Sequence, residues 1–167
     1  MNSNQSEFVT TESFNAPLDT VWKAWTETEE LKKWWGPEGV IIVHCTNDLR
    51  PGGVMHYGME IPGVTTMWGK WVYSEIVVPS KIVSIVSFSD KDQGMSRHPF
   101  APDWPMETHS TILFEEIGDK TKITVKWTTY NSNEEEVKTF ASNLENMKQG
   151  WVGTFNQLAN YLKTKAF

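Results

Sequence analysis

The feature that most constrains the fold is one apolar stripe that continues through residues 133–165. Its large apolar side chains recur at steps of three and four residues, the period of a helix with one buried face: Val137, Phe140, Leu144, Met147, Trp151, Phe155, Leu158 and Leu162. Asn133, with Glu136 three residues later, has the pattern of a capping box at the start of this helix. A helix of about 30 residues is about 45 Å long, so it must lie along a sheet.

The preceding residues alternate between apolar and polar side chains at a period near two, which is typical of strands. The strands predicted by this alternation and by the turn residues between them are 7–14, 40–46, 54–61, 65–78, 82–88, 106–117 and 121–130. Two short helices follow the first strand: one opens at Pro17 with Asn15 nearby to cap it, and one is capped by Thr28. The pattern predicts an α+β fold: a strand, two short helices, six antiparallel strands and one long helix.

The last two strands can be paired from the turn between them. Gly118-Asp119 is a two-residue hairpin signal, and a hairpin centred there sets Phe114 opposite Ile123 and Ser110 opposite Trp127. The apolar face of this hairpin therefore ends in small residues far from the turn. The room above them is filled either by a neighbouring side chain or by a cavity.

Aromatic and thioether side chains exceed what a small core needs, with 9 Trp, 8 Phe, 4 Tyr and 7 Met. Such side chains often line a cavity, although they can also fill the available space themselves. The candidate lining residues for a small apolar or aromatic ligand are Trp34, Trp35, His56, Met59, Met67, Trp71, Tyr73, Phe88, Trp104, Ser110, Trp127, Trp151 and Phe155. His56, Tyr73 or Arg50 would orient a polar end of that ligand.

Residues 90–105 form a connection without periodicity, yet they include Met95, Phe100 and Trp104 among several prolines. Loops of this length are uncommon and are often lids or binding loops. The apolar residues favour a segment that folds over the mouth of a cavity. The alternative is a surface excursion without a binding role.

The histidines raise the question of a metal site. A hairpin centred near Arg50 and Pro51 sets His44 opposite His56, but no acidic residue or cysteine stands at a supporting ligand spacing, and Cys45 points to the other face. Two half-exposed strand histidines without a metal are the favoured interpretation.

Acid–base chemistry has a few candidates. Glu12, Glu60 and Glu75 lie on strands with one buried face, where a carboxylate with a raised pKa could act as a general acid or base. Arg50 could hold an anion, although it more often fixes a hairpin through backbone carbonyls. Motifs for a serine nucleophile, a phosphate loop or a dinucleotide cofactor are missing from the sequence. We therefore expect no cofactor, and a binding protein is favoured over an enzyme.

Composition narrows the partners. A formal charge of −6, from 21 acidic and 15 basic residues, argues against nucleic-acid binding and against docking on anionic lipid. The chain has no run approaching the roughly 20 apolar residues that cross a bilayer, and its single cysteine excludes an internal disulfide. We expect one cytoplasmic domain over residues 1–167, with a core of about 7–165, that is a monomer or a homodimer.

Several segments resemble the START-like (SRPBCC, birch-pollen-allergen-like) superfamily, and within it the family of homologues of the activator of the heat-shock-protein-90 ATPase. The segments that carry the resemblance are 15–26, Leu31-Lys32-Lys33-Trp34-Trp35-Gly36-Pro37, 48–53, 75–79, and Gly150-Trp151 with Leu158 and Leu162. This resemblance implies a helix-grip fold, in which a curved antiparallel sheet wraps the long last helix around an internal cavity.

Three functions follow from these observations. The favoured one is binding of a small hydrophobic molecule in the internal cavity. The family resemblance implies an alternative, a co-chaperone that docks on a heat-shock-protein-90-type chaperone and stimulates its ATPase. A third is a cavity-based enzyme of the cyclase or hydrolase type, in which Glu60, Arg50 or His56 would take part.

Overall fold

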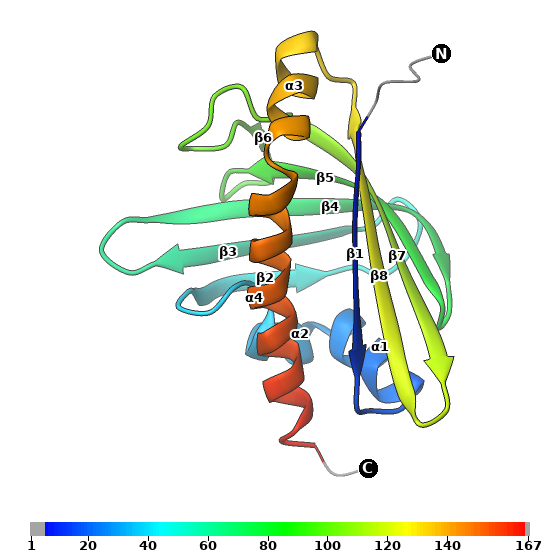
Figure 1. Cartoon of the computed structure of the whole chain (residues 1–167). Helices are drawn as coiled ribbons and strands as arrows, with labels where there is room; N and C mark the ends of the chain where they lie inside the picture. The colour runs from blue at the N-terminus through cyan, green and yellow to red at the C-terminus, as the bar shows by residue number, and fades with distance from the viewer. Residues whose placement is uncertain (1–5, 166–167) are drawn as a thin grey trace.

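One curved antiparallel sheet bends around the C-terminal helices in the computed structural model, which describes residues 6–165 (Figure 1). Its strands are β1 (Glu7–Phe14), β2 (Ile41–Asn47), β3 (Val54–Ile61), β4 (Thr65–Val77), β5 (Lys81–Ser89), β6 (Met95–Ser96), β7 (Glu107–Ile117) and β8 (Lys120–Tyr130). The helices are α1 (Leu18–Thr26), α2 (Thr28–Trp34), α3 (Glu134–Ser142) and α4 (Leu144–Leu162). The α+β helix-grip fold is therefore confirmed.

The strand order across the sheet is β1-β8-β7-β5-β4-β3-β2, with β6 paired only to the end of β5. The first strand thus pairs with the last, and β1 and β2 form the two edges. Helices α1 and α2 connect these edges, and α4 runs along the sheet between them (Figure 1). Strand β6 was not predicted, because two residues are too few to show a period.

The hairpin between β7 and β8 has the predicted register, with Phe114 opposite Ile123 and Ser110 opposite Trp127. The indole Nε1–H of Trp127 donates a hydrogen bond of 2.8 Å to the hydroxyl of Ser110, which is fully buried. A neighbouring side chain therefore fills the room above Ser110, whereas Thr108, the next small residue on this face, lines a cavity.

The predicted single C-terminal helix is wrong at one point, since the structure divides it at Asn143. The capping box of Asn133 and Glu136 is present at the start of α3. At Asn143 the side-chain amide donates to the carbonyl of Thr139 at 2.7 Å, while the backbone N–H bonds to the carbonyl of Phe140. The side chain thus takes the acceptor that the backbone N–H would have in a continuous helix, which interrupts the run.

The capping of α1 and α2 also differs from the prediction. Neither helix has a side-chain cap: the N-cap positions are Pro17 and Glu27, and Thr28 is already helical. Glu27 ends α1, where its N–H bonds to the carbonyl of Lys23 at 2.9 Å, and it also precedes the first residue of α2. Because the two helices share this junction, no separate capping residue fits between them.

Stacked and edge-to-face aromatic rings fill much of the space between the sheet and the helices. Trp25 of α1 stacks on Trp151 of α4, with ring centroids 6.1 Å apart and planes within 8° of parallel. Trp25 also contacts Trp34 and Phe114, at centroid distances of 5.2 and 5.6 Å. These rings fix α4 against α1, α2 and the sheet.

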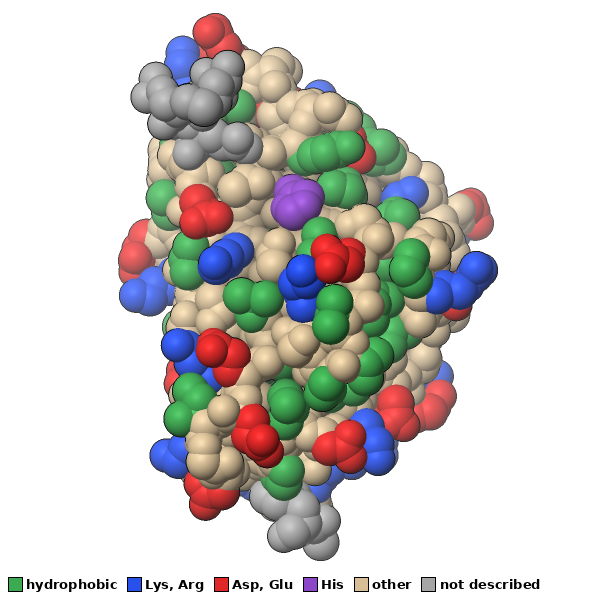
Figure 2. Space-filling view, turned by 90° about the vertical axis from the view of Figure 1, so that its right-hand side faces the viewer, with side chains coloured by type: hydrophobic (Ala, Val, Ile, Leu, Met, Phe, Trp, Pro, Cys, Tyr) green, Lys and Arg blue, Asp and Glu red, His purple; other side chains and the backbone are tan. Residues whose placement is uncertain are grey.

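The side of the molecule on the right of Figure 1 carries acidic and basic side chains that stand beside one another, and hydrophobic side chains that adjoin one another toward the lower right of the view (Figure 2). Opposite charges also pair across the sheet, as in Lys122 and Glu115, whose nitrogen and oxygen lie 3.9 Å apart. Among the helices of residues 6–165, none is both long enough and apolar enough to cross a bilayer.

Candidate ligand-binding cavity

Two adjoining cavities lie between the sheet and the C-terminal helices. The larger has a volume of about 390 Å³ and borders the junction of α3 and α4, and the smaller has a volume of about 210 Å³ and lies farther along α4. Both are lined by Tyr57, Met59, Trp127 and Met147, so these four residues lie between the two cavities.

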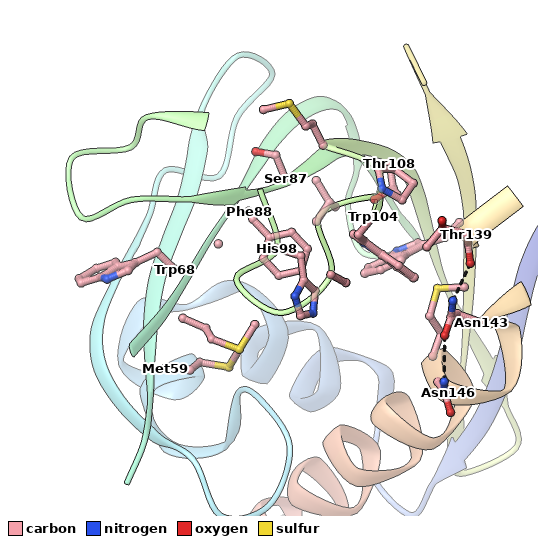
Figure 3. Close-up of a pocket in the computed structure, with 18 of the residues that line it drawn as sticks. Met59, Trp68, Ser87, Phe88, His98, Trp104, Thr108, Thr139, Asn143 and Asn146 are labelled. Carbon is pink, nitrogen blue, oxygen red and sulfur yellow. Dashed lines mark hydrogen bonds between the residues drawn. The ribbon is translucent and has the colours of Figure 1, made fainter. Parts of the chain in front are cut away.

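Five parts of the fold enclose the larger cavity (Figure 3): β3 and β4, the end of β5, the segment that precedes β7, one residue each of β7 and β8, and the α3–α4 junction. Most of its lining side chains are apolar, among them Met59, Met67, Phe88 and Trp104, and polar groups come from His98, Asn143 and Asn146. Methionines suit such a wall because their flexible thioether chains adapt to different ligand shapes.

Many of the candidate lining residues lie at these cavities. Those at the larger one are Met59, Met67, Phe88, Trp104 and Trp127. Those at the smaller one are Trp35, Met59, Trp71, Trp127 and Trp151. The remaining candidates line neither of the two cavities: Trp34, His56, Tyr73, Ser110 and Phe155.

The packing of these remaining residues explains their positions. Trp34 is buried between α1 and α2, where its Nε1–H donates to the carbonyl of Ala24 at 2.8 Å. Phe155 packs edge-to-face on a ring of β1 at 5.6 Å. Tyr73 donates its hydroxyl proton to Asn47 Oδ1 at 2.6 Å, and burial raises the pKa of this hydroxyl. Ser110 is covered by an indole, as described above.

The position of His56 contradicts two expectations, its pairing with His44 and its place in the cavity lining. It lies opposite Thr46, not His44, because the pairing of Asn47 with Met55 centres the hairpin on Pro51 rather than on Arg50. Its side chain is also only 1% exposed, stacks on Trp68 at 5.3 Å and bonds through Nε2 to the carbonyl oxygen of Asp90 at 2.9 Å. Because strand neighbours alternate, His56 lies on the sheet face turned away from Tyr57 and the cavity. The structure thus overturns its predicted role in the lining.

The rings of His44 and His56 nevertheless meet, with centroids 5.0 Å apart. No group of three or more metal-ligating side chains is found in residues 6–165.

The predicted acid–base residues also lie outside the cavities. Arg50 is exposed and pairs with Asp48 at 2.8 Å within the turn between β2 and β3. Glu12 and Glu75 are exposed, and Glu60 is half-buried at the end of β3 without lining either cavity. These carboxylates sit on edge positions or strand ends that solvent reaches, so the expectation of a buried carboxylate among them is wrong.

His98, for which the sequence indicates a loop position and no partner, faces the larger cavity from the segment before β7 (Figure 3). Its ring lies 4.8 Å from Phe88 and 6.4 Å from Trp104, measured between centroids. Nδ1 accepts a hydrogen bond of 3.0 Å from the backbone N–H of Phe100, and burial lowers the pKa of the imidazole. The ring is therefore held in the neutral form whose proton is on Nε2, available as a donor.

Two amides from the α3–α4 junction add polar groups on the opposite wall (Figure 3). Asn146 donates to Asn143 Oδ1 at 2.9 Å, and Asn143 in turn donates to the carbonyl of Thr139. Asn146 is exposed, so this chain of hydrogen bonds runs from solvent to the cavity wall. A continuous helical pattern gave no sign of it.

The segment 90–105 lines the larger cavity through His98, Ala101 and Trp104, whereas Met95 and Phe100, on which the lid interpretation also rested, are exposed and do not line it. The guanidinium of Arg97 holds the segment to the start of α3 by an ion pair of 2.7 Å with Glu136, whose side chain is buried. Burial alone would raise the pKa of Glu136, but the backbone N–H of Asn133 and the Arg97 guanidinium outweigh burial and lower it.

The curved sheet, the long terminal helix and the cavity between them define a START-like helix-grip protein. The sequence profile of the family described as "Activator of Hsp90 ATPase homolog 1-like protein" matches residues 15–163, and the chain belongs to this family. A search among curated proteins finds no match.

Solved structures share the fold at low sequence identity. Protein Ms6760 from Mycobacterium smegmatis is 24% identical, with a TM-score of 0.75 and coverage of 96% of this chain and 93% of that one. The AHSA1 protein from Silicibacter pomeroyi is 15% identical, with a TM-score of 0.71 and coverage of 96% and 100%. DynU16, from the dynemicin biosynthetic locus, is 18% identical, with a TM-score of 0.65 and coverage of 95% and 47%.

Proposed function

We propose that the protein binds a small, mostly apolar molecule in the larger cavity. The observation that carries this proposal is a space of about 390 Å³ with a predominantly apolar wall. Ligand sites typically have volumes of about 300–1,000 Å³, apolar linings and a few placed polar groups. The cavity combines all three properties.

The polar groups give the ligand an orientation. An apolar body would lie among Met59, Met67 and Phe88, while the Nε2–H of His98 offers a donor from the covering segment. The lowered pKa of His98 supports this role, because a neutral imidazole costs less to bury beside an apolar ligand than a charged one. Burying most of such a ligand among these side chains would provide the main favourable free energy.

A cavity-filling variant tests the proposal. Ala101 lines the cavity from the covering segment, so Ala101→Phe would place a ring in the ligand's space without altering the sheet. Asp103→Phe, an exposed position two residues away that does not line the cavity, is the matched control. Binding of a panel of apolar and aromatic compounds would be measured by native mass spectrometry and tryptophan fluorescence.

We expect Ala101→Phe to weaken binding at least about tenfold, since a ring of that size excludes several ligand atoms. Asp103→Phe should bind as the wild type does. Equal binding by both variants, or failure of the whole panel to bind the wild type, would refute the proposed function.

The family description favours a second candidate, stimulation of a heat-shock-protein-90-type ATPase. The ATPase rate of such a chaperone would be measured with and without the protein, and with Ala101→Phe. Stimulation that persists when the cavity is filled would identify a docking function independent of the ligand. An unchanged rate with the wild type would remove this candidate.

The third candidate is a cavity-based enzyme of the cyclase or hydrolase type, and similarity to a protein of a biosynthetic locus is the observation behind it. The titratable side chains at the larger cavity are His98 and Tyr57, whereas Arg50, Glu60 and His56 lie elsewhere. The test is the turnover of a His98→Gln variant that still binds ligand. Unchanged turnover in this variant would rule out His98 as the general acid or base.

A further inference from the structure

The walls of the two cavities are free of permanently charged side chains. Among residues 6–165, no aspartate, glutamate, lysine or arginine lines either cavity, although the chain contains 21 acidic and 15 basic residues. The polar side chains of the larger cavity are hydroxyls, amides and one imidazole, among them Thr139, Asn146 and His98. An ionised group on a ligand would therefore lose its hydration without gaining a partner of opposite charge, which is costly.

The charged side chains that fix the covering segment are paired within the protein. The guanidinium of Arg97 donates to the carboxylate of Glu136 at 2.7 Å. It also donates to the carbonyls of Pro102 and Trp104, at 3.1 and 3.5 Å. Glu136 in turn accepts the backbone N–H of Asn133 at 2.9 Å. Neither charge can serve a ligand without giving up these partners, so they do not supply the missing counter-charge.

Among the described lining residues, only His98 has a side chain that could become positively charged near neutral pH. Its Nδ1 accepts the backbone N–H of Phe100 at 3.0 Å, and a proton on Nδ1 would remove this acceptor. The ring lies beside Phe88 and Trp104, and burial lowers the pKa of the imidazole. The fold thus keeps His98 neutral, with its proton on Nε2.

The Nε2–H of His98 is open to a ligand. It has no hydrogen-bond partner within residues 6–165, yet it is not among the buried polar atoms that lack one there, which are Trp35 Nε1, Trp71 Nε1 and Ser84 Oγ. Unlike those atoms, it can be reached from the cavity that its ring lines (Figure 3). A neutral acceptor oxygen would complete its hydrogen bonding, whereas a protonated amine has no lone pair to offer.

We propose that the cavity selects an uncharged ligand, a ketone, ester or amide with an apolar body, and discriminates against carboxylates and amines of the same shape. The acceptor oxygen of the ligand faces the Nε2–H of His98, and its body lies among Met59, Met67 and Phe88. This inference rests on the proposed function and adds the charge state of the ligand to it. The selectivity arises because the site provides a donor but no counter-charge.

The test compares three probes that share a naphthalene body. 2-Acetylnaphthalene is neutral and has an acceptor, 2-ethylnaphthalene is neutral and has none, and 2-naphthoic acid is ionised at neutral pH. Affinities would be measured by isothermal titration calorimetry. At about pH 7 we expect 2-acetylnaphthalene to bind at least about tenfold more tightly than 2-naphthoic acid, because the carboxylate loses its hydration without compensation.

A pH series separates the charge of the ligand from that of the protein. Between about pH 7 and about pH 6, the neutral fraction of a carboxylic acid rises about tenfold. The affinity for 2-naphthoic acid should therefore rise about tenfold, while that for 2-acetylnaphthalene stays constant. The same rise should occur in His98→Phe, because it belongs to the ligand. A rise that disappears in this variant would assign the effect to protonation of His98 and overturn the proposal.

Variants of histidine test the donor. His98→Phe removes the Nε2–H and keeps a ring, so it should weaken 2-acetylnaphthalene binding at least about threefold while 2-ethylnaphthalene still binds as before. His109→Phe, at a half-buried histidine of β7 that lines neither cavity, is the matched control and should leave both affinities unchanged. Equal losses for the two probes in His98→Phe would show that the ring, and not its donor, contributes to binding, which overturns the assigned role of Nε2.

A lysine placed in the wall tests the missing counter-charge directly. Thr139 lines the larger cavity from α3, so Thr139→Lys should strengthen 2-naphthoic acid binding at least about tenfold at about pH 7. Ala141→Lys adds the same charge at an exposed position of the same helix that lines neither cavity, and it should not change this affinity. Equal effects of the two lysines would mean that the overall charge of the protein, and not the cavity wall, sets the selectivity.

The outcomes distinguish this inference from the proposed function. Equal affinity for 2-acetylnaphthalene and 2-naphthoic acid at about pH 7, or an affinity for the acid that does not change with pH, overturns the charge assignment and leaves the cavity function intact. Failure of all three probes to bind also overturns it, and the wider compound panel then decides the cavity function separately. If a variant fails to fold, the pH series of the wild type decides the question.

Discussion

Two serines on neighbouring strands provide a matched test of how much a buried hydroxyl contributes to stability with and without a hydrogen-bond partner. Ser84 of β5 and Ser110 of β7 lie directly opposite each other, and both are fully buried. Ser110 accepts the indole N–H of Trp127 at 2.8 Å, whereas the hydroxyl of Ser84 has no hydrogen-bond partner within residues 6–165. The same substitution to alanine should therefore have opposite consequences at the two positions.

Ser110→Ala removes the hydroxyl that accepts the N–H of the half-buried Trp127, and the loss of such a hydrogen bond typically costs about 0.5–1.5 kcal/mol. For a domain of this size, this corresponds to a fall in Tm of roughly 2–4 °C for each kcal/mol. Ser84→Ala removes a buried hydroxyl that contributes no hydrogen bond, so its effect on the free energy of unfolding should be neutral or stabilising. Both values would come from urea unfolding followed by circular dichroism, with the m-value as a check on the denatured state.

The comparison between the two variants is what makes the result decisive, because both lose one oxygen atom from the same layer of the core. Equal destabilisation would mean that lost packing, and not the orphaned indole, sets the cost. A harmless Ser110→Ala would show that Trp127 finds another acceptor. Either result would refute the reasoning.

Three further predictions concern the covering segment and the glycines. The pKa of Glu136 is lower in the folded state than in the unfolded state, so its ionised form stabilises the fold above the unfolded-state pKa, and this stability is lost as the pH falls through the folded-state pKa. Glu136→Gln should therefore flatten the acid limb of a curve of stability against pH. Arg97→Gln should raise the pKa of Glu136, measured by NMR of the carboxyl group. Gly69→Ala should destabilise by about 1–3 kcal/mol in urea unfolding, because its Cβ collides with Tyr57. Gly150→Ala, with no atom within 4 Å of the added Cβ, should stabilise by about 0.5–1 kcal/mol in the same assay, and a loss of stability there would contradict the assigned helix geometry.

The sequence predicted the sheet well because local signals specify it. The turn at Gly118-Asp119 sets the register of β7 and β8, and a period of two then assigns every side chain of the hairpin to a face. The break at Asn143 could not be seen in the same way. The apolar stripe continues through both helices, and the interruption depends on one side-chain hydrogen bond to Thr139.

The site was predictable only in its large apolar residues. His56 follows the alternation of β3, but both faces of that strand are buried, so periodicity could not tell the cavity side from the other. His98 lies in a segment without any period, and its position depends on the ion pair of Arg97 with Glu136 across a long stretch of sequence. The only sequence features that could have indicated a cavity position for His98 were the aromatic residues and prolines around it.

The position of the larger cavity along α4 has a consequence for how such a protein can change. One face of the turns from Phe155 to Leu162 is buried against β1 and α2, whereas Asn143 to Met147 border the larger cavity and Trp151 and Thr154 border the smaller one. Anchorage and recognition are thus assigned to different turns of one helix. Substitutions at the recognition end can alter ligand preference while the anchoring end keeps the fold, which gives this architecture room to diversify its ligands.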